Sequence, residues 1–205
     1  MRLINVLDEV LGQKGKVKVL RALISSSGGL TARGIARKVG LTHWACIKNL
    51  RELELSGLVR SEKVGKANLY TLNRDNLVNK ELLLPLFKKE KKLLKTVLNW
   101  IMKQIESKPV SVILFGSVAT GKEDVDSDID LCFVVKDRKE AKKLERELTG
   151  ISSDLYQQLG KKFSPYILEL SVFKKKYEKG VRVIREIVRE GILIYGKPIS
   201  EVIIR

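Results

Sequence analysis

Hydrophobic residues in the first third of the chain recur every three or four positions and then alternate with polar ones. This change of period predicts helices followed by strands. Thr31 and Thr42 can cap two of the helices, and Gly40 and Gly57 stand where those helices should end. The predicted helices cover residues 3–11, 17–24, 32–39 and 43–56, and the predicted strands cover 58–64 and 68–72.

The pattern changes again after residue 76. Apolar residues at helical spacing continue to 107, with lysines on the polar positions and Pro85 marking a kink or a helix start. Beyond Lys108-Pro109, strand-like and helix-like segments alternate. We expect strands at 110–115, 129–135, 166–173 and 192–195, and helices at 138–148, 154–159 and 174–189.

The order of helix, helix, turn, helix and hairpin over Leu30 to Asn73 resembles a winged helix-turn-helix domain. In that family the second helix of the motif enters the major groove, and the hairpin, or wing, contacts phosphate or the minor groove. The resemblance places Leu41, Cys46, Leu50, Leu53 and Leu58 in the core. It implies that DNA is contacted by Lys48, Arg51, Lys63 and Lys66, with His43 and Trp44 in reach of base edges. Trp44 and Ile47 leave open a second interpretation, in which this face serves dimerisation or another protein contact.

Charge supports a nucleic-acid partner for the N-terminal half. The chain has 40 Lys and Arg against 24 Asp and Glu, a net charge of +16. Residues 1–76 contribute +8, residues 77–109 contribute +5 and residues 110–205 contribute +3. An excess of this kind favours an anionic partner, although a lysine-rich surface of a thermophilic protein is the alternative. The lysines of the connector are either a solvated helix face or a further basic patch for nucleic acid.

The candidate chemistry lies in ILFGSVATGKEDVDSDIDLCFVV, residues 113–135. A strand-like run ends in Gly116-Ser117, and Asp128 and Asp130 follow with one residue between them. Alternate side chains of a strand share a face, so the two carboxylates should project together and need a cation to offset their repulsion. Hard oxygen ligands favour Mg²⁺, and a glycine lets the backbone approach a phosphate closely. The alternative is an acidic surface turn, since Glu123, Asp124 and Asp126 are also acidic.

The run from Phe115 to Leu131 resembles the signature of the polymerase-β-type nucleotidyltransferase superfamily, and most closely that of the minimal nucleotidyltransferases. The resemblance implies transfer of a nucleoside monophosphate, with AMP as the leading candidate, from ATP or another NTP to an acceptor hydroxyl. It implies two Mg²⁺ ions held by Asp128, Asp130 and a third carboxylate on a neighbouring strand. Glu169, a lone carboxylate in an apolar segment, is the best match for that catalytic and metal-binding role, and the alternative is an edge-strand glutamate that faces solvent. Gly116 and Ser117 would hold phosphates, and Lys122 would offset leaving-group charge or be a solvated loop residue.

Together these features predict an α+β protein with three parts. Residues 1–76 form the winged helix-turn-helix DNA-binding domain and residues 77–109 form a connector helix. Residues 110–205 form the minimal nucleotidyltransferase domain, a mixed sheet with flanking helices. No base-specificity segment is evident, so templated synthesis is not expected.

Partners follow from the same resemblance. Minimal nucleotidyltransferases pair with HEPN-type proteins, and some are antitoxins that attach AMP to a tyrosine of a HEPN ribonuclease. This implies a toxin–antitoxin function with a protein acceptor and DNA binding. A transcription regulator whose nucleotidyltransferase domain senses nucleotide or is inactive is the main alternative, and a small-molecule nucleotidyltransferase is another. We also expect a homodimer formed through residues 3–24 or the connector.

Cysteines and hydropathy add two expectations. Cys46 and Cys132 lie in apolar segments and are predicted core residues, and with a single histidine they do not suggest a zinc site. There is no evident signal peptide and no apolar run of 18 residues. We therefore expect a soluble, cytoplasmic protein without a membrane partner.

Overall fold

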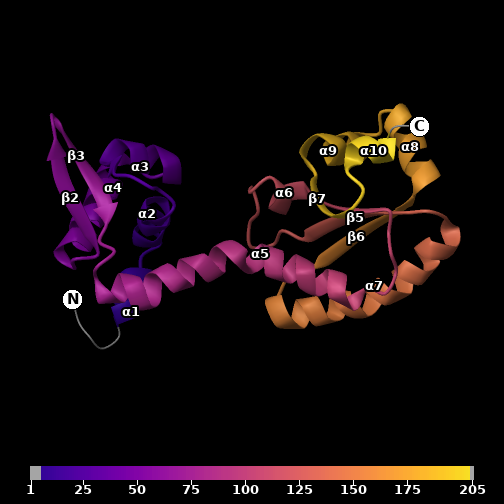
Figure 1. Ribbon diagram of the computed structural model, residues 1–205, viewed down its shortest axis with the longest axis horizontal. Helices are drawn as coiled ribbons and strands as arrows, with labels where there is room; N and C mark the ends of the chain where they lie inside the picture. Colours follow the sequence, from indigo (N-terminus) through magenta and orange to yellow (C-terminus); the bar gives the residue numbers. More distant parts are fainter. Residues whose placement is uncertain (1–5, 204–205) are drawn as a thin grey trace. The chain divides into compact units, whose positions relative to one another are not determined.

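The computed structural model describes residues 6–203, and the chain divides into two compact units, 1–93 and 94–205. Each unit has its own hydrophobic core and its own sheet (Figure 1). The predicted α+β class is confirmed. No helix within residues 6–203 combines the length and the apolar composition needed to cross a bilayer.

The N-terminal unit has the winged helix-turn-helix arrangement. Its elements are α1 (Val6–Leu11), α2 (Lys14–Ile24), β1 (Leu30–Thr31), α3 (Ala32–Val39), α4 (His43–Leu55), β2 (Val59–Val64) and β3 (Ala67–Leu72). The predicted caps form: Thr31 Oγ1 accepts from the Gly34 amide at 3.1 Å, and Thr42 Oγ1 accepts from the Ala45 amide at 3.2 Å. Of the predicted helix over 3–11, residues 3–5 lie outside the described residues.

The core of this unit joins its helices to the wing. Four of the five predicted core positions are fully buried: Cys46, Leu50, Leu53 and Leu58. The fifth, Leu41, is half-buried at the edge of the same cluster. The sheet has the order β1-β3-β2 with antiparallel pairing throughout. This packing leaves one face of α4 and the tip of the wing exposed.

The connector is helical from a π-helical turn, η1 (Asn79–Leu83), through α5 (Leu84–Gln104). Proline has no amide hydrogen to donate, and a wider turn just before Pro85 accommodates that loss. Nδ2 of the buried Asn79 side chain donates to the carbonyls of Leu58 at 2.8 Å and Asn73 at 2.7 Å, which fixes the start of the connector to the wing. The division of the chain into two units falls within α5, between Leu93 and Leu94. The domain boundaries at 76 and 109 remain predictions.

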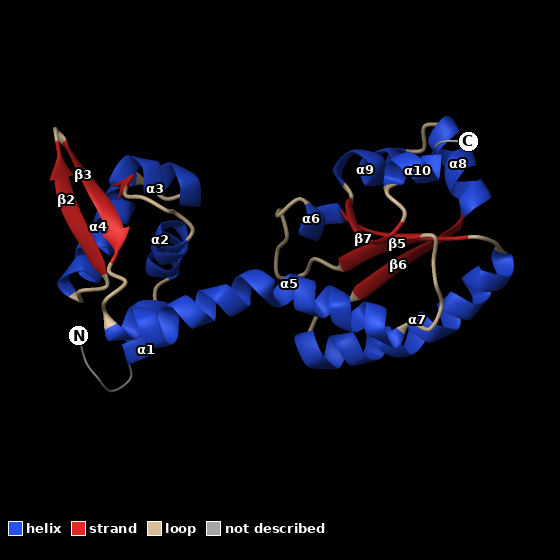
Figure 2. Ribbon diagram, viewed as in Figure 1, coloured by secondary structure: helices blue, strands red, loops and turns tan. Residues whose placement is uncertain are grey.

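The C-terminal unit is a four-stranded mixed sheet between two layers of helices (Figure 2). The strand order is β6-β5-β4-β7, with β5 parallel to β6 and the other pairs antiparallel. The end of α5 and α7 cover one face, and α8, α9 and α10 cover the other. Its remaining elements are β4 (Ser111–Phe115), α6 (Gly116–Ala119), β5 (Ile129–Val135), α7 (Arg138–Leu159), β6 (Phe163–Glu169), α8 (Leu170–Glu178), α9 (Arg182–Glu190), β7 (Ile192–Gly196) and α10 (Ile199–Ile203).

Four predicted segments differ from the structure. The two helices expected at 138–148 and 154–159 are one continuous α7, because Leu148, Ile151 and Leu155 bury the same face across the predicted break. The strand expected at 166–173 is instead β6 followed by α8, in which Phe173 is buried. The single helix expected at 174–189 is α8 and α9, separated at Gly180, whose φ of 67° favours glycine.

Candidate functional site

Strand β5 separates two hydrophobic clusters and so determines where its polar residues lie. Ile129, Leu131 and Phe133 pack in the cluster with α7. Cys132 and Val134 pack in the other cluster, which contains residues of α8 and α9. Because side chains alternate along a strand, Asp130 lies on the α8 and α9 side.

Asp128 and Asp130 are brought together at the start of β5. Asp128 immediately precedes the strand and accepts a hydrogen bond of 2.8 Å from the Ser164 hydroxyl of β6. Partial burial, and then the nearby charge of Asp128, raise the pKa of Asp130 above its ordinary value. Such a pair of carboxylates on one face is a suitable donor set for a hard divalent cation.

Gly116 begins the short turn α6, directly beside Asp130. Phe115, the last residue of β4, is paired with Asp130, and Gly116 has a φ of 75°. A Cβ atom at Gly116 would overlap Oδ2 of Asp130. The absence of a side chain therefore permits the close approach of backbone and carboxylate.

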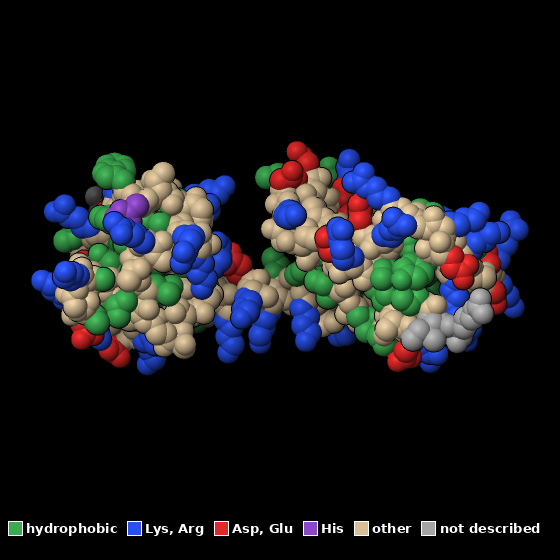
Figure 3. Space-filling view, turned by 90° about the horizontal axis from the view of Figure 1, so that it is seen from above, with side chains coloured by type: hydrophobic (Ala, Val, Ile, Leu, Met, Phe, Trp, Pro, Cys, Tyr) green, Lys and Arg blue, Asp and Glu red, His purple; other side chains and the backbone are tan. Residues whose placement is uncertain are grey.

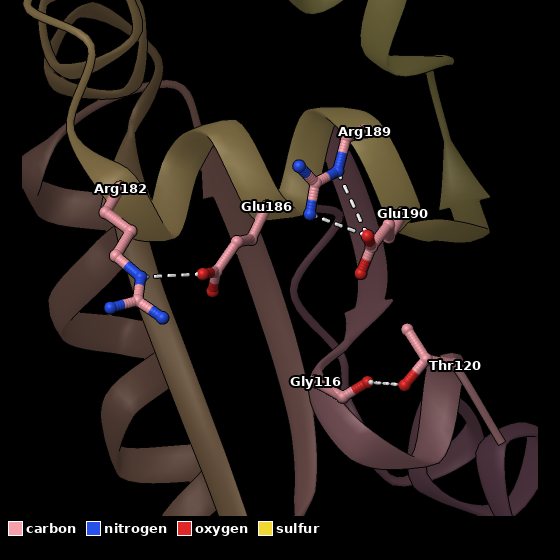
Figure 4. Close-up of polar contacts among 6 residues, drawn as sticks. All are labelled: Gly116, Thr120, Arg182, Glu186, Arg189 and Glu190. Carbon is pink, nitrogen blue, oxygen red and sulfur yellow. Dashed lines mark hydrogen bonds and ion pairs between the residues drawn. The ribbon is translucent and has the colours of Figure 1, made fainter. Parts of the chain in front are cut away.

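Helix α9 lies beside α6 (Figure 4). Thr120 Oγ1 donates to the Gly116 carbonyl at 3.1 Å and so closes the α6 turn. The two arginines drawn on α9 are paired with glutamates of the same helix: Arg182 with Glu186 at 2.9 Å, and Arg189 with Glu190 at 2.7 Å. These arginines carry compensated charge, so they are poor candidates for the primary phosphate contacts.

The loop between the two halves of the motif is held by Lys161. Its ammonium group donates to the carbonyls of Asp124 at 2.9 Å, Val125 at 3.1 Å and Ser127 at 3.0 Å. Lys161 follows the left-handed Gly160 that ends α7. This arrangement determines the path of the chain into Asp128. Lys122 lies in the same loop with an exposed side chain, and its amide donates to the Ser117 carbonyl at 2.9 Å.

The prediction that Glu169 joins the two aspartates is wrong. In the parallel pairing of β5 with β6, Asp130 is opposite Ser164, and Glu169 is opposite Val135. Five residues of strand separate the two positions, which is about 16 Å at the usual rise. The error comes from the expected strand boundaries, which placed Glu169 in the middle of a strand rather than at its end. Among the side chains that the structure describes, no group of three could hold a metal ion.

Sequence reasoning missed three residues of this region. Ser164 and Tyr166 lie on the same face of β6, since they alternate with Pro165, and the Lys176 ammonium donates to the Tyr166 hydroxyl at 2.8 Å. Of these three residues, Ser164 is the one that hydrogen-bonds a motif aspartate, Asp128. No local signal marks it, because its place opposite Asp130 depends on how β6 aligns with β5.

The residues predicted to contact DNA lie on the exposed surface of the N-terminal unit. His43, Trp44, Lys48 and Arg51 are exposed on α4, and Lys63 and Lys66 are exposed on the wing. Trp44 is 73% exposed, with the Lys48 ammonium 5.8 Å from its ring centroid. A groove of about 470 Å³ between α3, α4 and the wing is lined by Arg33, His43, Ile47, Lys66, Tyr70 and neighbouring residues. Arg33 was not predicted. Figure 3 shows Lys and Arg side chains distributed over this unit.

Solved structures with related folds are distant. A predicted DNA-binding transcriptional regulator from E. coli is 22% identical, with 42% of this chain and 84% of that chain covered and a TM-score of 0.36. A homodimeric winged helix-turn-helix domain from Mycobacterium bovis is 20% identical, with coverage of 50% and 83% and a TM-score of 0.32. A toxin–antitoxin structure with AMP-PNP is 19% identical, with coverage of 51% and 77% and a TM-score of 0.31.

Sequence comparison is more specific for the C-terminal unit. No curated protein is a significant match to the chain. The family model described as a nucleotidyltransferase domain matches residues 95–194, which contain Gly116, Asp128 and Asp130. Residues 95–194 therefore form a nucleotidyltransferase domain, as the motif predicted.

Proposed function

We propose that the chain binds an NTP, with ATP as the leading candidate, at Gly116, Ser117, Asp128 and Asp130 and transfers its nucleoside monophosphate to an acceptor hydroxyl. The observation that supports this most strongly is the convergence of two carboxylates beside a side-chain-free backbone position, in a domain of the nucleotidyltransferase family. The N-terminal unit would bind DNA.

The two aspartates fit a divalent cation, for which Mg²⁺ is the leading candidate. Their oxygens are hard ligands, and a cation would relieve the repulsion that raises the pKa of Asp130. When bound, such an ion would supply charge stabilisation to the phosphates. The Ser117 hydroxyl and the Gly116 backbone would orient the β- and γ-phosphates. The Lys122 ammonium is a further candidate to offset the charge of the leaving group.

The proposed step is a single displacement at the α-phosphorus. The acceptor oxygen forms a bond to that phosphorus, and the bond to the oxygen bridging the α- and β-phosphates breaks. Pyrophosphate leaves with the electron pair, and the acceptor proton passes to water. The protein residues bind and orient the reactants, which is the larger part of catalysis in phosphoryl-transfer reactions.

DNA binding by the N-terminal unit rests on charge and shape. Lys48, Arg51, Lys63 and Lys66 are exposed, and Arg33 adds a cation to the groove between α4 and the wing. Two copies on paired half-sites would raise the affinity of a small reading surface. A homodimer is therefore part of this proposal.

The catalytic proposal is tested by two substitutions and a matched control. Asp128→Asn and Asp130→Asn should each abolish Mg²⁺-dependent ATP binding, measured by calorimetry, and transfer of label from α-³²P-ATP. Asp126→Asn removes the same charge from an exposed loop residue of the same motif and should leave both unchanged. Transfer that survives in both motif variants would contradict the proposal.

The acceptor can be searched with the same label. A HEPN-type protein encoded beside this chain is the first acceptor to test, because the motif resembles that of antitoxins that modify such proteins. Label on a tyrosine of that protein would support a toxin–antitoxin role. Label on an aminoglycoside-like small molecule would instead support a small-molecule nucleotidyltransferase.

A second candidate function is a DNA-binding regulator whose C-terminal domain binds a nucleotide without transferring it. Ser164 favours this candidate, because it stands on the neighbouring strand beside the two aspartates where a third carboxylate was expected. Nucleotide binding that changes DNA affinity, without label on any acceptor, would support it over transfer.

A further inference from the structure

Ser164 occupies the position on β6 that faces both motif aspartates. It is opposite Asp130 in the strand pairing, and its hydroxyl donates to Oδ2 of Asp128 at 2.8 Å. A side chain at this position is therefore within direct reach of any ion held by the pair. The residue there is neutral.

No other acid in the described part of the chain completes the set. Glu169 lies five residues along β6, about 16 Å from the pair. Asp124 is exposed and accepts hydrogen bonds from the Ser127 hydroxyl at 2.8 Å and the Asp126 amide at 3.2 Å, inside its own loop. The described side chains contain no cluster of three that could ligate a metal.

The supply of protein ligands then fits one divalent ion. The two carboxylates can hold one such ion, and the phosphates of a bound nucleotide would complete its coordination. A second ion between the aspartates and an acceptor would have only the serine hydroxyl as its additional protein ligand. The face also carries a fixed positive charge nearby: the Lys176 ammonium is hydrogen-bonded to Tyr166, two residues beyond Ser164.

We propose that this site binds a single divalent cation together with its nucleotide, and that Ser164 sets that number. The inference rests on the nucleotide binding proposed above and departs from the two ions that the motif implied. Substituting Ser164→Asp would add the missing carboxylate and create a place for a second ion.

Counting bound Mn²⁺ tests the proposal without any turnover. The full chain would be titrated with Mn²⁺ in the presence of saturating α,β-methylene-ATP, which cannot transfer its nucleotide, and bound ions would be counted by electron paramagnetic resonance. The wild-type chain should bind one ion per bound nucleotide. Ser164→Asp should bind two, a twofold increase, and Ser164→Ala should still bind one.

The outcomes separate this inference from the proposed function. Two ions in the wild-type chain would overturn the inference and leave nucleotide binding intact. Nucleotide binding without any ion would overturn the inference and the metal-dependent part of the proposed function, and no binding of nucleotide or ion would overturn both entirely. Circular dichroism would identify a Ser164→Asp chain that failed to fold. Ser164→Glu, which adds the same charge, would then take its place, and the wild-type count would still decide the number of ions.

Discussion

Gly116 lies against the carboxylate of Asp130, so close that a Cβ atom on the glycine would overlap Oδ2. The glycine also has a φ of 75°, a conformation that other residues adopt at a cost. The end of β4 and the start of β5 are thereby joined into one surface. Two independent constraints, the contact and the backbone angle, explain why glycine stands at this position.

Substituting Gly116→Ala should therefore abolish nucleotide binding. The added methyl group would displace the Asp130 carboxylate, and the backbone angle alone should cost about 1 kcal/mol of stability. Calorimetric titration with Mg²⁺-ATP measures the first effect and urea unfolding the second. Gly121→Ala is a matched control, because Gly121 has a φ of 67° but a Cβ atom there would meet no other atom within 4 Å. If both variants bind nucleotide equally well, the contact with Asp130 has no role in the site.

Asp130→Asn should stabilise the metal-free protein while removing its function. The folded-state pKa of Asp130 is raised by burial and then by Asp128, so the ionised form costs stability. That cost is absent below the unfolded-state pKa of about 3.9 and appears as pH rises through the folded-state pKa. We expect the variant to melt about 2 °C higher at pH 7 in EDTA, a difference that disappears in acid. A variant that melts lower at pH 7 would contradict this account.

Lys161→Met should weaken nucleotide binding without unfolding the domain. The lysine ammonium donates to three carbonyls of the loop that leads into Asp128, and methionine keeps the length of the side chain but none of the bonds. We expect about a tenfold loss of affinity for Mg²⁺-ATP, the scale typical of residues that support a metal ligand. Faster proteolysis within residues 121–127 should accompany it. Lys162→Met is the control, because Lys162 is exposed and supplies only a backbone carbonyl, to the Ile129 amide at 3.0 Å.

Much of the N-terminal unit could be predicted from sequence because its signals are local. Thr31, Gly40 and Thr42 mark helix ends by interactions with their own neighbours, and these formed as expected. The pairing of Asp128 with Asp130 was predictable for the same reason, since one residue separates them.

The third position of the site could not be predicted, because it depends on how β6 aligns with β5. The apolar run from Tyr166 to Phe173 was interpreted as a single strand, whereas the strand ends at Glu169 and Phe173 is buried as part of α8. With the observed boundaries, the polar residue of β6 that lies beside the two aspartates is Ser164 and not Glu169. The groove lined by Arg33 could not be predicted for the same reason, since α3 and the wing come together only in the folded unit.

Cys132 should be unreactive in the folded protein. It is fully buried, and burial raises the pKa of its thiol to about 12. The thiol therefore remains protonated at pH 8, and reaction with a maleimide should be negligible until the protein unfolds. Cys46 is also buried, with a raised pKa, so the described fold presents no reactive cysteine. Mass spectrometry before and after denaturation in guanidinium should detect zero and then two labels, and labelling of the native protein would show that this core opens readily.

DNA binding should depend on salt and on the groove between α4 and the wing. Each phosphate contact contributes about 0.9 to the slope of log affinity against log salt concentration, so Arg33→Gln and Lys66→Gln should each reduce that slope by about 1. Lys197→Gln makes the same charge change on an exposed residue of the nucleotidyltransferase unit and should leave the slope unchanged.

Trp44→Ala distinguishes the two interpretations of the exposed α4 face. Weaker DNA binding by a chain whose mass in solution is unchanged would assign the indole to DNA, whereas a change of mass in sedimentation would assign it to a protein interface.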